Sequence, residues 1–405
     1  MSQMISSVFT WVNKRLPIAN TFERHLSKHP VPKKVNFWYL FGALASVALI
    51  IQIVSGIWLI MPYENTEEGA FASVEYIMRD VDYGWVIRYM HTTGASLFFA
   101  VVYLHMFRGL LYGSYQKPKE LVWIFGCTIY LAMMAEGFLG YVLPYGQMSY
   151  WGAQVIISLF GAIPYIGESL ELWVRGDYYI SGITVSRFFA LHVVALPLVL
   201  IALVFLHLVA LHEVGAGNPE GVDIEEHLDE DGVPLDSVPF YPYKVLNALV
   251  GIGVFMTVFA IIMFFFPEGG GYFIEMANFE EANPLVTPEH IAPVWYYSPY
   301  YTMLRAVPDP LGGLIVMASA VAIFFVVPWL DQSKVASIRY KGIYSKIAIA
   351  LFGISFLTLG YLGTVSVTEV RKTVSIICTI LYFSFFLLMP IYTSLEKTKV
   401  VPTRL

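Results

Sequence analysis

Residues 91–105 read HTTGASLFFAVVYLH, an apolar segment that begins and ends with histidine. Residues 192–207, HVVALPLVLIALVFLH, repeat the pattern with a histidine at each end. A polar side chain inside a membrane helix is costly, and a lone histidine there is often a packing or hydrogen-bonding residue that faces the bundle interior. Two matched pairs are poorly explained by packing alone. The four histidines, His91, His105, His192 and His207, are therefore candidate ligands.

The composition is that of an integral membrane protein. Of the 405 residues, 57% are hydrophobic and only 13% are charged, whereas soluble domains carry about 25% charged residues. Windows of about 20 apolar residues can cross a bilayer as helices. The sequence contains eight such windows and so predicts an all-α protein with eight transmembrane helices, at residues 37–61, 84–107, 121–143, 184–211, 245–267, 311–330, 346–364 and 374–394. A net charge of −6 argues against nucleic acid as a partner.

The histidine spacing places one candidate ligand near each end of each helix. At 3.6 residues per turn, an offset of 14 returns to within about 40° of the same face, roughly 21 Å farther along the axis. An offset of 15 overshoots by about 60° and rises about 22.5 Å. Two such helices side by side supply two axial pairs, His91 with His192 and His105 with His207. This arrangement predicts two stacked bis-histidine haems, one near each membrane surface.

Other cofactors and other uses of the histidines fit the sequence less well. Cys127 and Cys378 both fall inside predicted spans, and no C-x-x-C-H motif is present, so any haem must be held by coordination alone. A metal or proton-relay site is disfavoured because no carboxylate accompanies the histidines in their own spans at ligand spacing. A transporter that binds its substrate between broken helices at mid-membrane remains an alternative from another class.

Glycines with the same spacing occur in the first and third predicted spans. Gly42 and Gly56 are 14 residues apart, and so are Gly126 and Gly140. A porphyrin needs a helix without a side chain at its point of closest approach, and glycine provides that gap. Small residues also mediate ordinary helix packing in membranes, but the match to the histidine spacing favours the cofactor.

Three arginines lie close in sequence to the histidines. Arg88 precedes His91 by three residues and Arg108 follows His105 by three, so each is a candidate partner for an anionic haem propionate. Arg187 precedes His192 by five residues, and for this side chain a simple position at a helix end is an equally good interpretation.

The positive residues predict the orientation of the chain. An even number of crossings places both termini on one side, and the segments on that side contain most of the lysines and arginines. The opposite loops contain only Arg79, Arg175, Arg305, Arg371 and Lys372. Both termini are therefore expected in the cytoplasm. The number of crossings places the acidic loop 213–243 on the same side. Its negative charges do not contradict the orientation, because acidic residues have little weight in this rule.

The chain resembles cytochrome b, the di-haem subunit of the cytochrome bc1 complex, over essentially its whole length. The resemblance is specific because long motifs occur in order, namely DYGWVIRYMHTTGASLFF, GYVLPYGQMSYWGAQVI, SRFFALHVVALPL, LHEVGAGNP and PVWYYSPYYTMLRAVPDPLGG. It implies a di-haem domain over residues 1–215 and a second domain over residues 216–405 that completes the quinol-oxidation site. Eight helices in one chain imply the bacterial, cytochrome-c-linked form.

The resemblance also implies a function, that of the catalytic subunit of quinol–cytochrome c reductase in the respiratory chain. Quinol is oxidised at an outer site; one electron goes to a Rieske iron–sulfur protein, and the other passes through a low-potential outer and a high-potential inner haem b to a quinone on the cytoplasmic side, coupled to proton translocation. The implied partners are the Rieske protein, cytochrome c1, ubiquinone and membrane lipid, in a homodimeric complex of the bacterial inner membrane. The main redox alternative is a haem-bearing anchor of a hydrogenase or formate dehydrogenase.

The outer site departs from the family pattern. The family motif Pro-Glu-Trp-Tyr reads Pro293-Val294-Trp295-Tyr296 here, and valine cannot accept a proton. Glu289 or His290, just upstream, is the hypothesised substitute; the alternative is that both are exposed loop residues. Among the aromatic residues, Tyr296 and Tyr301 are the candidates for contact with the quinol at this site.

The inner site departs as well. His212, in LHEVG, matches the histidine of the family's inner quinone site, but the family's Lys-Asp pair is Asn247-Ala248 here. Lys244 is a candidate replacement, and a role as a membrane-end anchor explains it at least as well.

The second histidine pair is spaced by 15 residues instead of 14, and Pro197 lies five residues after His192. Because proline removes a backbone hydrogen bond, we predict a local distortion of this helix that absorbs the extra residue and returns both imidazoles to one face.

Overall fold

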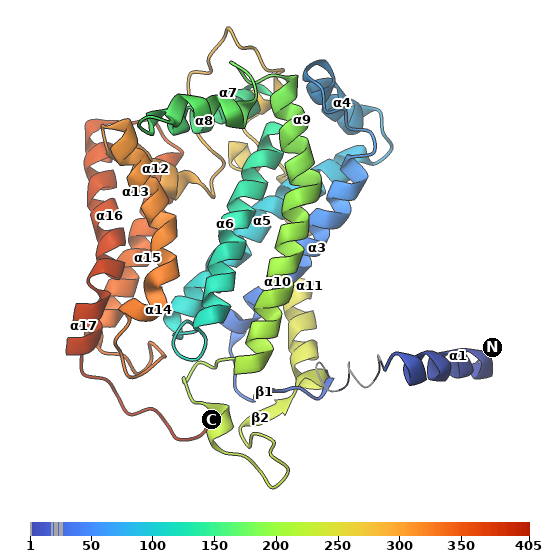
Figure 1. Ribbon diagram of the computed structural model, residues 1–405, viewed down its shortest axis with the longest axis vertical. Coiled ribbons are helices and arrows are strands. Elements are labelled where there is room, and N and C mark those ends of the chain that lie inside the picture. The colour runs from blue at the N-terminus through green and yellow to red at the C-terminus, as the bar shows by residue number, and fades with distance from the viewer. Residues whose placement is uncertain (1, 18, 20–22, 24–26) are drawn as a thin grey trace.

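The computed structural model describes residues 2–17, 19, 23 and 27–405 (Figure 1). Eight helical spans in this part of the chain are long and apolar enough to cross a membrane, which confirms the predicted all-α architecture. In order they are η2 (Phe37–Leu40) with α3 (Phe41–Leu59), α5 (Gly84–Leu111), α6 (Glu120–Val142), α9 (Gly182–Ala190) with η4 (Leu191–Ala195) and α10 (Leu196–Val214), η6 (Phe240–Lys244) with α11 (Val245–Phe265), α13 (Pro310–Ala322) with η9 (Ile323–Val326) and α14 (Val327–Leu330), α15 (Ile343–Gly363), and α16 (Glu369–Leu387).

The spans form two groups that share one apolar core. In the first group α3 packs along α5 and α6 packs along α10, while α11 packs against α3 and α5. In the second group α15 packs between α16 and the short helix α12 (Ser298–Ala306), which also contacts α13. Buried side chains from both groups, such as Phe99, Tyr130, Tyr296, Met303 and Phe386, belong to a single cluster. The segment before α12 therefore lies where the two groups meet.

Short amphipathic helices cover the upper end of the bundle as drawn in Figure 1. They are α4 (Glu67–Arg79), α7 (Gln147–Ser158), η3 (Leu159–Ala162) and α8 (Gly167–Arg175). Each is too short to cross a membrane. The loop that follows α11 contains η7 (Gly269–Gly271) and η8 (Met276–Phe279), and Ser149 N donates to the Asn278 side chain, so this loop packs on α7.

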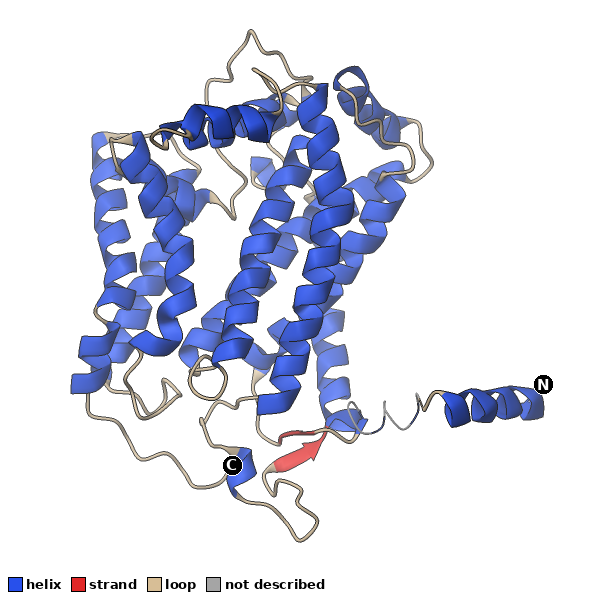
Figure 2. Ribbon diagram, viewed as in Figure 1, coloured by secondary structure: helices blue, strands red, loops and turns tan. Residues whose placement is uncertain are grey.

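At the lower end, segments near both termini contact the loop between α10 and α11. Strand β1 (Pro30–Pro32) pairs antiparallel with β2 (Ser237–Pro239), the only sheet in the described residues, drawn in red in Figure 2. The same loop contains η5 (Ile224–Glu226), and α1 (Ser2–Arg15) precedes β1 in the chain. The buried Asp236 accepts hydrogen bonds from Lys33 (2.5 Å) and from Arg404 (3.0 Å), near the two ends of the chain. Both ends thus lie on one side, as an even number of crossings requires.

The predicted boundaries of the last span are wrong. The window 374–394 contains two helices, α16 and α17 (Met389–Leu395), and α16 begins five residues before the window. The Thr368 hydroxyl accepts a hydrogen bond from Arg371 N and starts the helix within a charged turn that hydropathy misses. Near the other end, Pro390 has no backbone N–H to continue the hydrogen-bond pattern of α16. The chain therefore begins a new helix, α17, instead of extending α16.

The predicted distortion in the fourth span is confirmed. Residues Leu191–Ala195 form a π-helical turn, and α10 follows it with Pro197 in its first turn. A π-helical turn accommodates one more residue than an α-helical turn. It therefore compensates for the 15-residue spacing, and His192 and His207 face the same neighbouring helix, α6.

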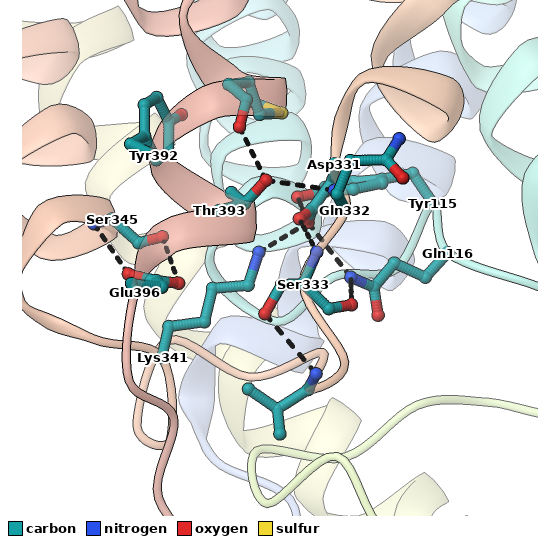
Figure 3. Close-up of polar contacts among 12 residues, drawn as sticks. Tyr115, Gln116, Asp331, Gln332, Ser333, Lys341, Ser345, Tyr392, Thr393 and Glu396 are labelled. Carbon is teal, nitrogen blue, oxygen red and sulfur yellow. Dashed lines mark hydrogen bonds and ion pairs between the residues drawn. The ribbon is translucent and has the colours of Figure 1, made fainter.

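A buried ion pair ties the two helix groups together near the lower end (Figure 3). Lys341 Nζ lies 2.5 Å from Asp331 Oδ2, and both side chains are almost fully buried. The same carboxylate accepts hydrogen bonds from Tyr115 Oη (2.7 Å) and Gln116 Nε2 (3.0 Å), in the loop between α5 and α6, and from Ser333 N (2.9 Å). Asp331 thus joins the first group to the loop between α14 and α15.

Replacing Lys341 by methionine is expected to lower the free energy of unfolding by about 3–5 kcal/mol, because it leaves a buried carboxylate without its cation. Thermal denaturation of the purified complex, followed by near-ultraviolet circular dichroism, measures the loss. The control is Arg79→Gln, which removes an exposed pair with Glu75 and should change stability by less than about 1 kcal/mol. Equal shifts for the two variants would contradict this role of the buried pair.

Candidate functional site

The four candidate ligands lie in two facing pairs between α5 and the fourth span. His91 and His192 have ring centroids 6.2 Å apart with an interplanar angle of 87°, near the upper end of the bundle. His105 and His207 have centroids 6.4 Å apart at 70°, nearer the lower end. The pairing predicted from the spacing is therefore the pairing in the structure.

The two separations fit one metal ion between each pair of rings. A metal–nitrogen bond is about 2.0–2.1 Å long, and a five-membered ring places its nitrogen about 1.1 Å from its centroid, so two imidazoles on one ion have centroids about 6.3 Å apart. No group of three or more His, Cys, Asp or Glu side chains able to hold a metal occurs among the described residues. The described residues thus offer two imidazoles at each site, and a porphyrin would supply the remaining donor atoms.

Each predicted glycine faces one of the histidines. A Cβ atom on Gly56 or Gly42, in α3, would lie 3.4 Å from His91 Cε1 or 3.1 Å from His105 Cε1. On α6, the corresponding distances are 3.4 Å from Gly126 to His207 Cε1 and 2.3 Å from Gly140 to His192 Cε1. A distance of 2.3 Å is far inside van der Waals contact, so Gly140 admits no side chain unless His192 moves. Glycine is required here by the approach of the ligand ring to the helix.

Hydrogen bonds orient the upper pair of imidazoles. Ser55 Oγ lies 2.9 Å from His91 Nδ1. His192 Nδ1 lies 2.9 Å from the backbone oxygen of Glu136 and 3.1 Å from its carboxylate Oε1. These contacts occupy Nδ1 and leave Nε2 available for a metal, as is usual for metal-binding histidines, whose other ring nitrogen is held by a hydrogen bond. The sequence analysis overlooked Ser55 and Glu136, although a carboxylate inside a predicted span is a signal in itself.

The arginines divide into two kinds. Arg108 is half-buried: its Nη1 donates to Ser114 Oγ at 3.0 Å, its guanidinium lies 4.7 Å from the Tyr39 ring centroid, and its Nε has no partner. Neither Arg108 nor Arg88 forms an ion pair with any described residue, so both can receive an anion. Arg187 instead donates to the backbone oxygen of Trp173, at the end of α8. For Arg187 the helix-end interpretation agrees with the structure.

The Val294–Tyr297 segment lies between the two helix groups near the upper end. Tyr296 is buried and stacks on Phe99 with 3.9 Å between centroids, and Trp295 Nε1 donates to Ser96 Oγ at 3.2 Å. Tyr301 Oη donates to the Ile291 oxygen at 3.1 Å. By contrast, Glu289 and His290 are both exposed. The structure thus agrees with the alternative in which these two are loop residues.

Glu275 is the carboxylate that the structure brings to this segment. It accepts a hydrogen bond from Tyr141 Oη, and burial raises its pKa to about 7. Burial and then the charge of Glu275 raise the pKa of Tyr296. Sequence analysis missed Glu275 because it lies 19 residues before Val294 and no motif connects the two.

At the lower end, His212 stands at the exposed end of α10 and packs against His29. The two ring centroids are 4.6 Å apart at an interplanar angle of 46°. His29 lies directly before β1, and this strand's pairing with β2 holds the N-terminal segment at the lower end. The sequence analysis did not identify His29, because nothing local links it to His212. Lys244 and Asn247 lie in η6 and the first turn of α11.

Comparison with known proteins places this architecture in a family. The family described as Cytochrome b/b6/petB matches residues 26–215, and that described as Cytochrome b(C-terminal)/b6/petD matches residues 281–383. Cytochrome b of Allochromatium vinosum is 54% identical over 100% of this chain and 99% of its own length. Cytochrome b of Rickettsia prowazekii is 46% identical over 98% of this chain and 97% of its own length.

A solved structure supports the same conclusion. A chain of a hyperthermophilic respiratory complex III superposes with a TM-score of 0.89 and 36% identity, over 96% of this chain and 99% of the other. The comparisons thus favour neither the transporter nor the anchor of a hydrogenase or formate dehydrogenase. The chain belongs to the cytochrome b family of haem-binding, multi-pass membrane proteins, which form the catalytic core of quinol–cytochrome c oxidoreductase, respiratory complex III.

Proposed function

We propose that this chain holds two b-type haems and uses them to connect a quinol-oxidising site at the upper end with a quinone-reducing site at the lower end. The proposal rests on the two facing pairs of imidazole rings. The ring centroids within a pair are 6.2–6.4 Å apart, and a glycine faces each of the four rings. His91 and His192 hold the outer, low-potential haem, and His105 and His207 hold the inner, high-potential haem. When bound, the haems carry single electrons across the membrane.

The residues around each pair bind and orient the cofactor. Gly42, Gly56, Gly126 and Gly140 leave room beside the rings, and Ser55 and Glu136 fix the ring orientation of the upper pair. Arg88 and Arg108 offer guanidinium groups to the anionic propionates, the partner that an unpaired, partly buried arginine favours.

The outer quinol site lies at the Val294–Tyr297 segment, with Tyr296 and Tyr301 in its wall. Glu275 accepts the proton that Val294 cannot, because it is a half-buried carboxylate whose charge acts on Tyr296 and its pKa of about 7 suits a general base near neutral pH. Glu289 and His290 are not part of this proposal, since both are exposed.

The inner quinone site lies at His212. His29, in ring contact with His212, offers a second imidazole at an end where the family's Lys-Asp pair is absent. Two neighbouring imidazoles can donate hydrogen bonds to a quinone oxygen and supply protons as it is reduced.

The proposed partners are a Rieske iron–sulfur protein and cytochrome c1 at the upper end, ubiquinone, and membrane lipid, in a homodimeric complex. The proposed location is the bacterial inner membrane with the lower end and both termini in the cytoplasm, as the distribution of positive residues predicts. Residues 1–215 would form the haem-binding domain and residues 216–405 the domain that completes the outer site.

A redox titration of the purified complex tests the proposal. We expect two low-spin b-type components with separate midpoint potentials, and quinol-dependent reduction of cytochrome c. A single b-type component would overturn the two-haem assignment, and a colourless chain would overturn the haem proposal altogether.

Gly140→Ala is expected to disturb the upper haem far more than the same change at Gly126. The added Cβ would lie 2.3 Å from His192 Cε1, whereas at Gly126 it would make an ordinary 3.4 Å contact with His207. Visible spectra and the haem-to-protein ratio should show partial loss or a shifted potential of one component in Gly140→Ala, and a much smaller change in Gly126→Ala. Equal behaviour of the two variants would contradict the assigned packing.

A further inference from the structure

A small hollow lined by three cations opens at the upper end of the second helix group, among α12, α15 and α16. It is lined by Arg305, Arg371 and Lys372 together with Ser366 and Ser375. No acidic side chain lines it. In the part of the chain that the structure describes, none of the three cations takes part in an ion pair.

The arginines of this hollow are held in place by neutral groups. Arg305 Nη2 donates to the Leu362 oxygen at 2.6 Å, at the end of α15, and its guanidinium lies 4.5 Å from the Tyr301 ring centroid. The buried Nε of Arg305 has no hydrogen-bond partner. Arg371 Nη1 donates to the Ser366 backbone oxygen at 2.8 Å and to its hydroxyl at 3.2 Å. The backbone thus fixes both guanidinium groups without neutralising their charge.

Three like charges around one hollow repel one another. An anion bound between them would replace this electrostatic repulsion with attraction. The amino end of the 19-residue helix α16 lies at the same place and adds the positive end of its dipole. Arginine binds phosphate oxygens with paired, charge-assisted hydrogen bonds.

The surroundings of the hollow indicate where the anion comes from. The hollow lies at the ends of two membrane spans, α15 and α16, at the depth where lipid headgroups are found. The neighbouring apolar side chains Tyr361, Val367 and Val370 are 57%, 58% and 74% exposed. Exposed apolar surface directly beside a cationic hollow suits a molecule with an anionic head and acyl chains.

We propose that this hollow binds the headgroup phosphate of an anionic phospholipid such as phosphatidylglycerol, with Arg305, Arg371 and Lys372 around the phosphate and the acyl chains along Val370. The hollow adjoins the proposed outer quinol site through the contact of Arg305 with Tyr301, but the lipid proposal does not depend on the haem or quinone assignments.

Lipid retention by the intact complex tests the proposal. The wild-type complex and an Arg371→Gln/Lys372→Gln variant are placed in nanodiscs of phosphatidylcholine with a minor fraction of phosphatidylglycerol, extracted in detergent and washed. Quantitative mass spectrometry then counts the phosphatidylglycerol retained per chain. We expect the variant to retain one molecule fewer. Equal retention by the two complexes would overturn the proposal.

Matched variants separate the site from general charge effects. Arg79→Gln removes an upper-end cation that is paired with Glu75 and should retain the wild-type amount, as should the charge-preserving Arg371→Lys/Lys372→Arg variant. A loss in Arg79→Gln as large as in the double variant would mean that surface charge alone holds the lipid. If the double variant does not assemble, the single variants are measured instead, and each is expected to lose lipid.

A second arm distinguishes lipid from free phosphate. Radiolabelled inorganic phosphate is added to wild-type complex in nanodiscs of phosphatidylcholine only. Negligible binding is expected, because a free ion gains nothing from the apolar surface at Val370. Binding of one phosphate that the double variant lacks would show an inorganic anion site and overturn the lipid assignment.

Discussion

Under the proposed two-haem assignment, His207→Leu is expected to lower the haem content of the complex from two b-type haems per chain to one. Leucine fills a similar volume but supplies no nitrogen, so only His105 of the lower pair would remain to hold the haem. Reduced-minus-oxidised spectra and the pyridine haemochrome content measure the loss. The component that remains should titrate at the lower of the two wild-type potentials, because the upper pair, His91 with His192, is intact.

His290→Leu is the matched control for this experiment. It makes the same chemical change at an exposed loop position and should keep both components at their wild-type potentials. His192→Leu provides the converse, since it should remove the low-potential component instead. Two unaltered components in His207→Leu would mean that this histidine is not a ligand, and the pairing proposed from the ring geometry would be wrong.

The parts of the site that the sequence predicted are those set by a helical period. His91 and His105, like Gly42 and Gly56, repeat along one helix each, and the period alone places them on a common face near opposite membrane surfaces. Eight spans follow from hydropathy for a similar reason, because a bilayer imposes one length on every helix that crosses it. Even the distortion beside Pro197 could be expected, since the spacing of 15 residues required a correction.

The parts that could not be predicted depend on contacts between distant segments. His29 meets His212 only because β1 pairs with β2, and Lys341 meets Tyr115 only through Asp331. Glu289 and His290 were reasonable substitutes for the missing glutamate by sequence distance, but the loop that carries them is exposed. Proximity along the chain says little about proximity in space where the chain is irregular.

Glu275→Gln is expected to slow quinol oxidation about 100-fold or more, the usual contribution of a general base. Burial raises the pKa of Glu275 to about 7, so the group is protonated and unable to accept a proton below that pH. The wild-type rate should therefore rise as the pH increases through about 7 and then level off. Glutamine cannot ionise, so the variant should lack this rise. Steady-state rates of cytochrome c reduction between pH 5.5 and 9 measure both effects.

Tyr141→Phe separates proton acceptance from a structural role of Glu275. The hydrogen bond from Tyr141 Oη favours the charged carboxylate and opposes the effect of burial. Removing it should raise the pKa of Glu275, so the rise in rate should move to higher pH while the maximal rate changes little. Glu289→Gln, at an exposed position, should leave rate and profile unchanged. If Tyr141→Phe lowered the maximal rate without moving the profile, Glu275 would be a structural residue and the proton of the quinol would need another acceptor.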